Sequence, residues 1–87
     1  MADLKELFLK ASEDVKKLNY RPSNDELLEL YAFYKQGTEG DVKGARPGML
    51  DIKGKAKYNA WAKLKGQSTE ASMTAYVAAV TRLLMKT

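Results

Sequence analysis

The chain has 87 residues, which is enough for one small domain and too few for two separate cores. Hydrophobic residues make up 45% of it, a share that is typical of a folded globular protein and not of a disordered one. Cysteine and histidine are absent, which excludes disulfides and thiolate metal sites and removes the commonest general base near neutral pH. The net charge of +4 favours an anionic partner without identifying it.

Nothing in the sequence indicates a membrane protein. No apolar run approaches the roughly 20 residues that a transmembrane helix needs. The first residues, Met1 to Lys5, lack the basic and apolar blocks of a signal peptide. We therefore expect a cytoplasmic protein without stable membrane insertion.

The first helix is predicted by a capping signal and by apolar spacing. Asp3 with Glu6 three residues later resembles a capping box. Apolar side chains then recur at three- and four-residue steps from Leu4 to Leu18, as on one face of an amphipathic helix. We expect the helix to end before Pro22, because proline disfavours helical geometry in the residue that precedes it.

A second helix is predicted to begin after Ser23 and to continue to about residue 39. Ser23 and Glu26 have the spacing of a capping box. Apolar side chains occupy most positions from Leu27 to Tyr34, which is a wider arc than one core stripe requires. This helix is therefore expected either to contact neighbours on two sides or to line a ligand groove.

Residues 37 to about 51 are rich in glycine and proline, so helix is not expected there. A connection of this length is unusual in a helical bundle, where loops have about 2–8 residues. It is either slack or an ordered crossover that allows helices two and three to run parallel. Met49, Leu50 and Ile52 favour the crossover, because they are predicted to anchor the loop to the core.

Two further helices complete the prediction. Asp51 is a plausible cap for a third helix that reaches Lys65 and is closed by Gly66. Ser68 is a plausible cap for a fourth, whose apolar stripe is the clearest in the chain. The predicted fold class is all-α, with four helices in a single domain.

A tyrosine and lysine pattern indicates where a ligand could bind. On a helix, Tyr31, Tyr34 and Lys35 share one face, and Lys53 and Lys57 share another. Each tyrosine alone is more often a core residue, and each lysine alone is more often solvated surface. Together they suggest a site for a flat ring that carries several negative charges, such as a nucleotide.

The sequence gives no reason to expect catalysis or a metal site. It contains no phosphate-binding P-loop, since no Gly-x-x-x-x-Gly-Lys-Ser/Thr occurs. Most carboxylates lie at helix starts or beside lysines, where capping and solvation explain them. No nucleophile and base pair and no cluster of metal ligands stands out. We expect a binding protein without a cofactor and not an enzyme.

Three blocks of the chain, residues 31–41, 46–48 and 53–61, together resemble the acyl-CoA-binding protein family. The resemblance covers nearly the whole chain and implies a single acyl-CoA-binding domain over residues 1–87. It implies a four-helix bundle with a long overhand connection between helices two and three. The implied function is high-affinity binding of long-chain fatty acyl-CoA thioesters, as an intracellular carrier and pool former, without catalysis. We expect a monomer that does not bind nucleic acid.

The resemblance also implies roles for particular residues. Tyr31, Lys35 and Lys57 match family residues that hold the 3′-phosphate of the adenosine, and Tyr34 matches the one that packs on the adenine. Further ligand-site positions and the apolar groove correspond to Lys16, Leu27, Leu28, Ala56 and Tyr76. The packing seam between the first and last helices corresponds to Phe8, Val15, Leu18, Tyr76, Val77, Val80 and Leu83.

The chain departs from the family pattern at Asn24, Gly37 and Tyr58, where an acid, alanine and tryptophan are usual. None of these removes a phosphate-binding residue, so the departures concern the shape of the groove. One alternative to the family function is a small basic module that binds nucleic acid or an anionic membrane through its lysines. An enzyme that acts on CoA esters is a more distant alternative.

Overall fold

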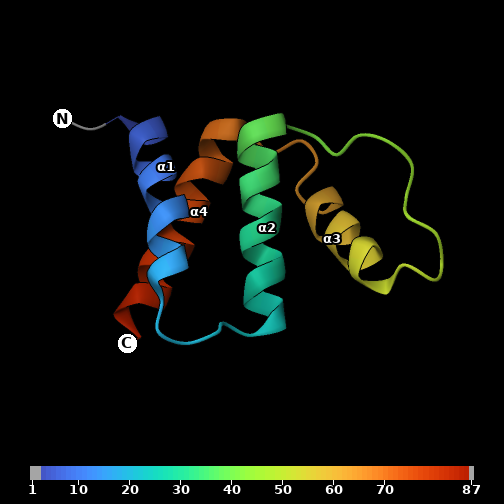
Figure 1. Cartoon of the computed structure of the whole chain (residues 1–87). Coiled ribbons are helices and arrows are strands. Elements are labelled where there is room, and N and C mark those ends of the chain that lie inside the picture. The colour runs from blue at the N-terminus through green and yellow to red at the C-terminus, as the bar shows by residue number, and fades with distance from the viewer. Residues whose placement is uncertain (1–2, 87) are drawn as a thin grey trace.

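The computed structural model describes residues 3–86, and these fold into helices without strands. The helices are α1 (Leu4–Asp14), α2 (Asn24–Glu39), α3 (Ile52–Ala62) and α4 (Thr69–Met85), with a short 3-10 helix, η1 (Val15–Lys17), after α1. Helix α2 lies in the middle, with α1 and α4 on one side and α3 on the other (Figure 1). The predicted all-α class is confirmed.

The side chains predicted to cap the helices all do so. The Asp3 carboxylate accepts a hydrogen bond from the Glu6 amide at 2.8 Å. Ser23 and Glu26 form a complete capping box, with reciprocal bonds of 3.1 and 2.9 Å. Asp51 and Ser68 accept bonds of 3.0 Å from amides in the first turns of α3 and α4. These bonds satisfy amide groups that a helix start leaves unpaired.

One predicted helix boundary near a glycine is wrong. Helix α3 ends at Ala62 and not at Lys65, because the chain turns before Gly66, whose φ is +91°. Helix α2 ends at Glu39, as predicted, and so includes Gly37 although the segment from residue 37 onward is rich in glycine. A Cβ on Gly37 would lie 3.2 Å from Met73 Cγ, so glycine here permits close approach of α4. The helical hydrogen bonds and this packing outweigh the low helix propensity of glycine.

The core lies where α1, α2 and α4 meet. Phe8 and Val80 are 2% and 1% exposed, and Leu30 of α2 packs with them. Helix α4 contacts both α1 and α2, while α3 packs on α2. The predicted seam between the first and last helices is confirmed: its members are either buried or partly buried against this cluster. Removal of apolar area from water here is the main stabilising contribution.

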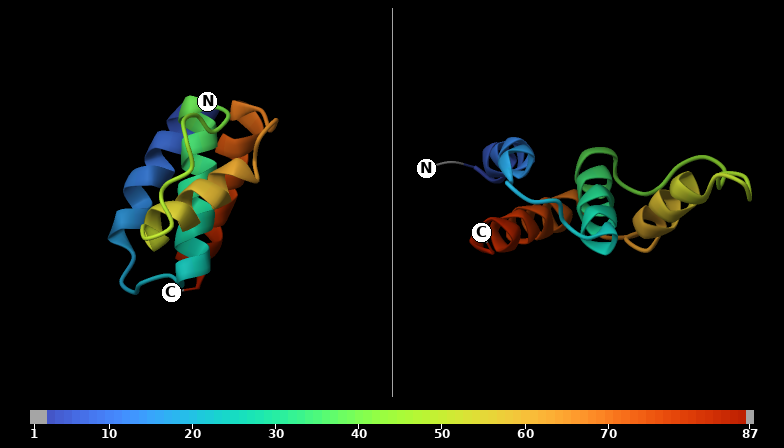
Figure 2. Two further views of the ribbon diagram at one scale, coloured as in Figure 1. Left: turned by 90° about the vertical axis from the view of Figure 1, so that its right-hand side faces the viewer. Right: turned by 60° about the horizontal axis from the view of Figure 1, so that its bottom comes forward.

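The long connection between α2 and α3 is a crossover. It leaves the end of α2, passes outside the bundle and returns at the opposite end, so α2 and α3 run in the same direction (Figures 1 and 2). The prediction that Met49, Leu50 and Ile52 anchor it is wrong, because they are 85%, 98% and 77% exposed. Polar bonds hold the connection instead. Asp41 accepts bonds from Gln36 and from the Gly66 amide at 2.9 and 2.8 Å.

Candidate functional site

The first candidate pocket, which we call the α1–α2 pocket, lies beside the end of α1 and the middle of α2. Its volume is about 470 Å³. It combines aliphatic, aromatic and cationic side chains, a lining suited to an organic ligand with negative charge. The lining residues are Val15, Lys16, Pro22, Leu27, Leu30, Tyr31, Tyr34, Lys35 and Tyr76.

Two aromatic rings that line this pocket, those of Tyr34 and Tyr76, pack on the buried ring of Phe8. The Tyr34 ring stacks on Phe8 with centroids 5.3 Å apart, and Tyr76 meets Phe8 edge to face at 5.0 Å. Tyr76 is only 4% exposed, and burial raises the pKa of its hydroxyl, so the phenol is neutral. Tyr34 is 38% exposed. Tyr34 therefore belongs to the packed wall and still offers ring surface to a ligand.

Two lysines lie over aromatic rings beside the pocket. The Lys57 ammonium is 5.4 Å from the centre of the Tyr31 ring, and that of Lys35 is 5.1 Å from the Trp61 ring. Both distances are within the range of a cation–π contact. Lys35 also pairs with Glu39, and this hydrogen bond raises the pKa of Lys35. Both ammonium groups are thus held by neighbours beside the pocket.

A second pocket, the front α2–α3 pocket, adjoins the first. It has a volume of about 310 Å³, and Leu27 and Tyr31 line both pockets. The front pocket is lined by Arg21, Asn24, Leu27, Leu28, Tyr31, Ile52, Lys53, Ala56 and Lys57. The fold thus brings all ten sequence-predicted site residues to these two adjoining pockets. Of these two pockets, only the first is lined by Lys16, Tyr34, Lys35 and Tyr76, and only the second by Leu28, Lys53, Ala56 and Lys57.

Sequence reasoning missed other residues that line these pockets, notably Arg21, Pro22 and Ile52. In the sequence, Pro22 indicates a helix stop, whereas Arg21, a cation close in the chain to predicted ligand residues, is itself a signal for an anion. Ile52 was assigned to the core because it is apolar. It instead begins α3 at the edge of the front pocket.

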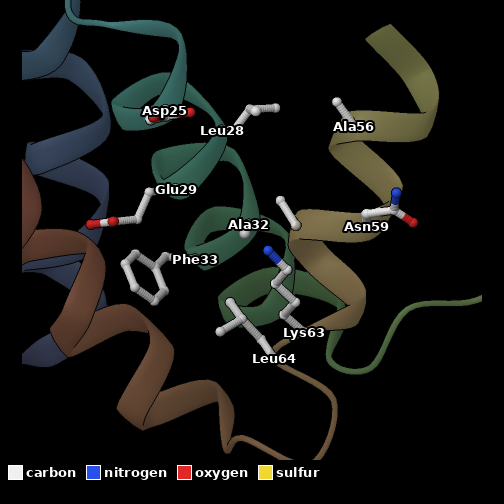
Figure 3. Close-up of a pocket in the computed structure, with 10 residues that line it drawn as sticks. Asp25, Leu28, Glu29, Ala32, Phe33, Ala56, Asn59, Lys63 and Leu64 are labelled. Carbon is white, nitrogen blue, oxygen red and sulfur yellow. The ribbon is translucent and has the colours of Figure 1, made fainter. Parts of the chain in front are cut away.

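A third pocket, the rear α2–α3 pocket, is also lined by residues of both α2 and α3 (Figure 3). Its volume is about 570 Å³. Leu28 and Ala56 line both it and the front pocket. None of the sequence-predicted lysines or tyrosines lines it.

The described part of the chain lacks both a metal-binding cluster and a membrane-spanning helix. Among residues 3–86, no group of acidic side chains is arranged to hold a metal ion. None of the described helices has both the length and the hydropathy to cross a bilayer.

The fold and the adjoining pockets define an all-α domain with an open, mixed aromatic, cationic and apolar binding surface. Its sequence matches the profile of the family described as "Acyl CoA binding protein" over residues 5–80. The chain therefore belongs to the acyl-CoA-binding protein family.

Individual relatives agree with this assignment. An acyl-CoA-binding protein homolog of Drosophila melanogaster is 52% identical over 81 residues, which cover 93% of this chain and 94% of the relative. The crystal structure of Oryza sativa acyl-CoA-binding protein 2 superposes with a TM-score of 0.92 at 38% identity, covering 95% of this chain and 90% of that one. The crystal structure of the acyl-CoA-binding protein from Moniliophthora perniciosa superposes with a TM-score of 0.89 at 40% identity. The match covers 99% of this chain and 83% of that one.

Proposed function

We propose that this protein binds long-chain fatty acyl-CoA thioesters with high affinity, as a monomeric cytoplasmic carrier and pool former, without catalysis. One observation carries the proposal: Tyr31 lines both adjoining pockets and has the Lys57 ammonium over its ring. A cationic, aromatic surface suited to a nucleotide thus continues directly into an apolar groove suited to a hydrocarbon tail.

Each of the two adjoining pockets is proposed to bind a different part of the ligand, the nucleotide head in one and the acyl tail in the other. In the α1–α2 pocket, Tyr34 offers aromatic surface to the adenine and packs on the buried ring of Tyr76, while Lys16 lies on η1. Tyr31, Lys35 and Lys57 surround the place proposed for the 3′-phosphate, which lysines hold as point charges. In the front pocket, Leu27, Leu28 and Ala56 line the path of the acyl chain, with Lys53 at its edge.

Calorimetric titration with acyl-CoAs of increasing chain length tests the proposal. We expect tight binding whose affinity rises with chain length, without release of free CoA on long incubation. Release of CoA would contradict the non-catalytic part of the proposal. A nucleic-acid or membrane module would instead lose affinity steeply with salt, because counterions are released on binding. A buried acyl chain leaves much of the binding free energy insensitive to salt.

Lys57→Ala is expected to weaken acyl-CoA binding by about 1.5–3 kcal/mol, the range for a hydrogen bond to a charged group. The loss should be much smaller for a dephospho-CoA ester, which lacks the 3′-phosphate. Titration of both ligands into both proteins measures the difference. Lys55→Ala is the matched control, because Lys55 is on the same helix but lines neither pocket. Equal losses for the two ligands would show that Lys57 does not bind this phosphate.

Tyr34→Leu is expected to weaken binding by about 1–3 kcal/mol, the range measured for base–aromatic stacking. Tyr34→Phe retains the ring and should retain most of the affinity. Because Tyr34 also stacks on Phe8, Tyr34→Leu should lower folding stability by about 0.5–1.5 kcal/mol. Titration and thermal unfolding separate the two effects. A large loss of stability with unchanged affinity would assign Tyr34 to the core alone.

A further inference from the structure

Glu39 lies one helical turn beyond Lys35 and has no role in the function proposed above. It is the last residue of α2, and it lines neither of the two pockets assigned to the ligand. The dipole of a helix disfavours a carboxylate in its last turn, and the last turn of α2 has no basic residue. The stability of α2 therefore does not explain why an acid occupies this position.

Glu39 bonds the ammonium group of Lys35, which the proposed function assigns to the ligand. Lys35 lines the α1–α2 pocket, and its ammonium lies 5.1 Å from the centre of the Trp61 ring. The Lys35 side chain is 25% exposed and that of Glu39 is 47% exposed, so solvent reaches both. An anionic ligand that enters the pocket therefore meets a lysine whose charge is already compensated by a carboxylate.

The other lysines of the two ligand pockets differ from Lys35 in this respect. Among the described residues, Lys57 forms no ion pair with a carboxylate. The same is true there of Lys16 and Lys53. Glu39 thus compensates one cation of the site and leaves the others available to a ligand.

A carboxylate in this position weakens the hold of Lys35 on a phosphate. A lysine ammonium has three hydrogen-bond donors, so it can bond a phosphate and Glu39 together, and the two acceptor oxygens then lie about 5 Å apart. Repulsion between two unit charges at that distance lowers a binding constant about fourfold at the dielectric constant of water, and salt reduces this to about twofold. If the phosphate instead displaces Glu39, the binding free energy is reduced by the ion pair that is lost.

We infer that Glu39 limits the affinity of the site for the ligand and its discrimination for the 3′-phosphate, because its carboxylate competes with that phosphate for Lys35. The inference rests on the proposed function, which places the 3′-phosphate among Tyr31, Lys35 and Lys57. Lys57 gives its full charge to the phosphate, whereas Lys35 shares its charge with Glu39. The consequence is faster release of the ligand, since changes in affinity within one site act mostly on the dissociation rate.

Glu39→Gln tests this inference, because glutamine keeps the length and bulk of glutamate and removes its charge. A phosphate monoester carries about 1.5 to 2 negative charges, so the variant should bind hexadecanoyl-CoA about three- to tenfold more tightly. The dephospho-CoA ester lacks the competing group and should bind both proteins nearly equally. Calorimetric titration of both ligands into both proteins measures the gain, which should shrink as the salt concentration rises.

Glu6→Gln is the matched control, since it changes the net charge by the same amount. Glu6 is an exposed residue in the first turn of α1 that lines neither ligand pocket and, among the described residues, forms no ion pair. It should leave both affinities unchanged. Unchanged or weaker binding of hexadecanoyl-CoA by Glu39→Gln, or an equal gain for both ligands, would overturn the inference and leave the proposed function intact. Failure of the unmodified protein to bind hexadecanoyl-CoA would instead overturn the proposed function.

A double-mutant cycle tests whether Glu39 acts through Lys35. Lys35→Ala should weaken hexadecanoyl-CoA binding about twofold more in the Glu39→Gln background than in the unmodified protein, because the phosphate then loses an uncompensated charge. Equal losses in the two backgrounds would contradict the competition. Thermal unfolding of each variant is the control for folding, and Glu39→Gln should leave Tm nearly unchanged, since an exposed ion pair one turn apart contributes little to stability.

Discussion

A free fatty acid is expected to bind this protein orders of magnitude more weakly than the CoA ester of the same chain. The pockets beside α2 are open at the surface, and the core between α1, α2 and α4 is filled by side chains such as Phe8 and Val80. Under the proposed function, the acyl chain therefore lies along α2 in an open groove, where the nucleotide anchors and partly covers it.

The reason for the large difference is that head and tail act together. Burial of a methylene stabilises the complex by up to about 0.8 kcal/mol, but only while the chain stays out of water. Without the head group, the lysines and tyrosines of the α1–α2 pocket contribute nothing to position the chain. CoA alone retains those contacts and should bind measurably, but less tightly than the ester.

Titration of the fatty acid, CoA and the acyl-CoA ester under one buffer condition measures this division. The expected order is ester, then CoA, then fatty acid, with the last separated from the ester by several powers of ten in Kd. Comparable affinity for fatty acid and ester would indicate an enclosed lipid cavity. In that case the proposal of a shared site for head and tail would be wrong.

The helices and the predicted ligand residues were accessible from sequence because they depend on local spacing. Tyr31, Tyr34 and Lys35 share a face of any α-helix, whatever that helix packs against. The caps at Ser23 and Asp51 are equally local, since each bonds an amide in the first turn of the helix that it caps. Placement of these faces around two adjoining pockets required the path of the crossover, which the family resemblance supplied.

What could not be predicted depends on contacts between distant parts of the chain. Met49, Leu50 and Ile52 are apolar, and composition alone assigned them to the core, yet the crossover leaves them exposed. Leu28 and Ala56 line both the front and the rear pocket, and no sequence pattern reports that shared lining. Gln36 is polar and was not singled out, but it is fully buried at 0% exposure.

Gln36 is the centre of a hydrogen-bond network that joins the end of α2 to α3 and to the chain segments before and after α3. Its amide nitrogen donates to Asp41 and to the Gln67 carbonyl, each at 2.9 Å, and its oxygen accepts from the Trp61 indole at 3.0 Å. The Gly66 amide and Gln36 both donate to Asp41 and lower the pKa of its carboxyl. The network thus links the start of the crossover, α3 and the turn into α4.

Gln36→Leu is expected to lower the free energy of unfolding by about 2–4 kcal/mol. The variant keeps similar bulk but loses all three bonds and leaves the Gln67 carbonyl without its donor, and an unsatisfied buried group costs about 1–3 kcal/mol. The Trp61 indole retains its bond to the Gly40 carbonyl at 2.8 Å, and Asp41 retains the Gly66 amide, which limits the loss. Denaturant unfolding measures it.

Thr38→Ala is the matched control, because Thr38 is exposed on the same helix and bonds only to carbonyls within it. Its effect should stay within about 0.5 kcal/mol. Gln36→Leu should also weaken acyl-CoA binding, since Trp61 holds α3 on α2 and lies beneath Lys35. That weakening should be similar for an ester and its dephospho form, unlike that of Lys57→Ala, because the whole of α3 is affected and not one charge. A stability loss below about 0.5 kcal/mol would show that the network is replaceable by apolar packing.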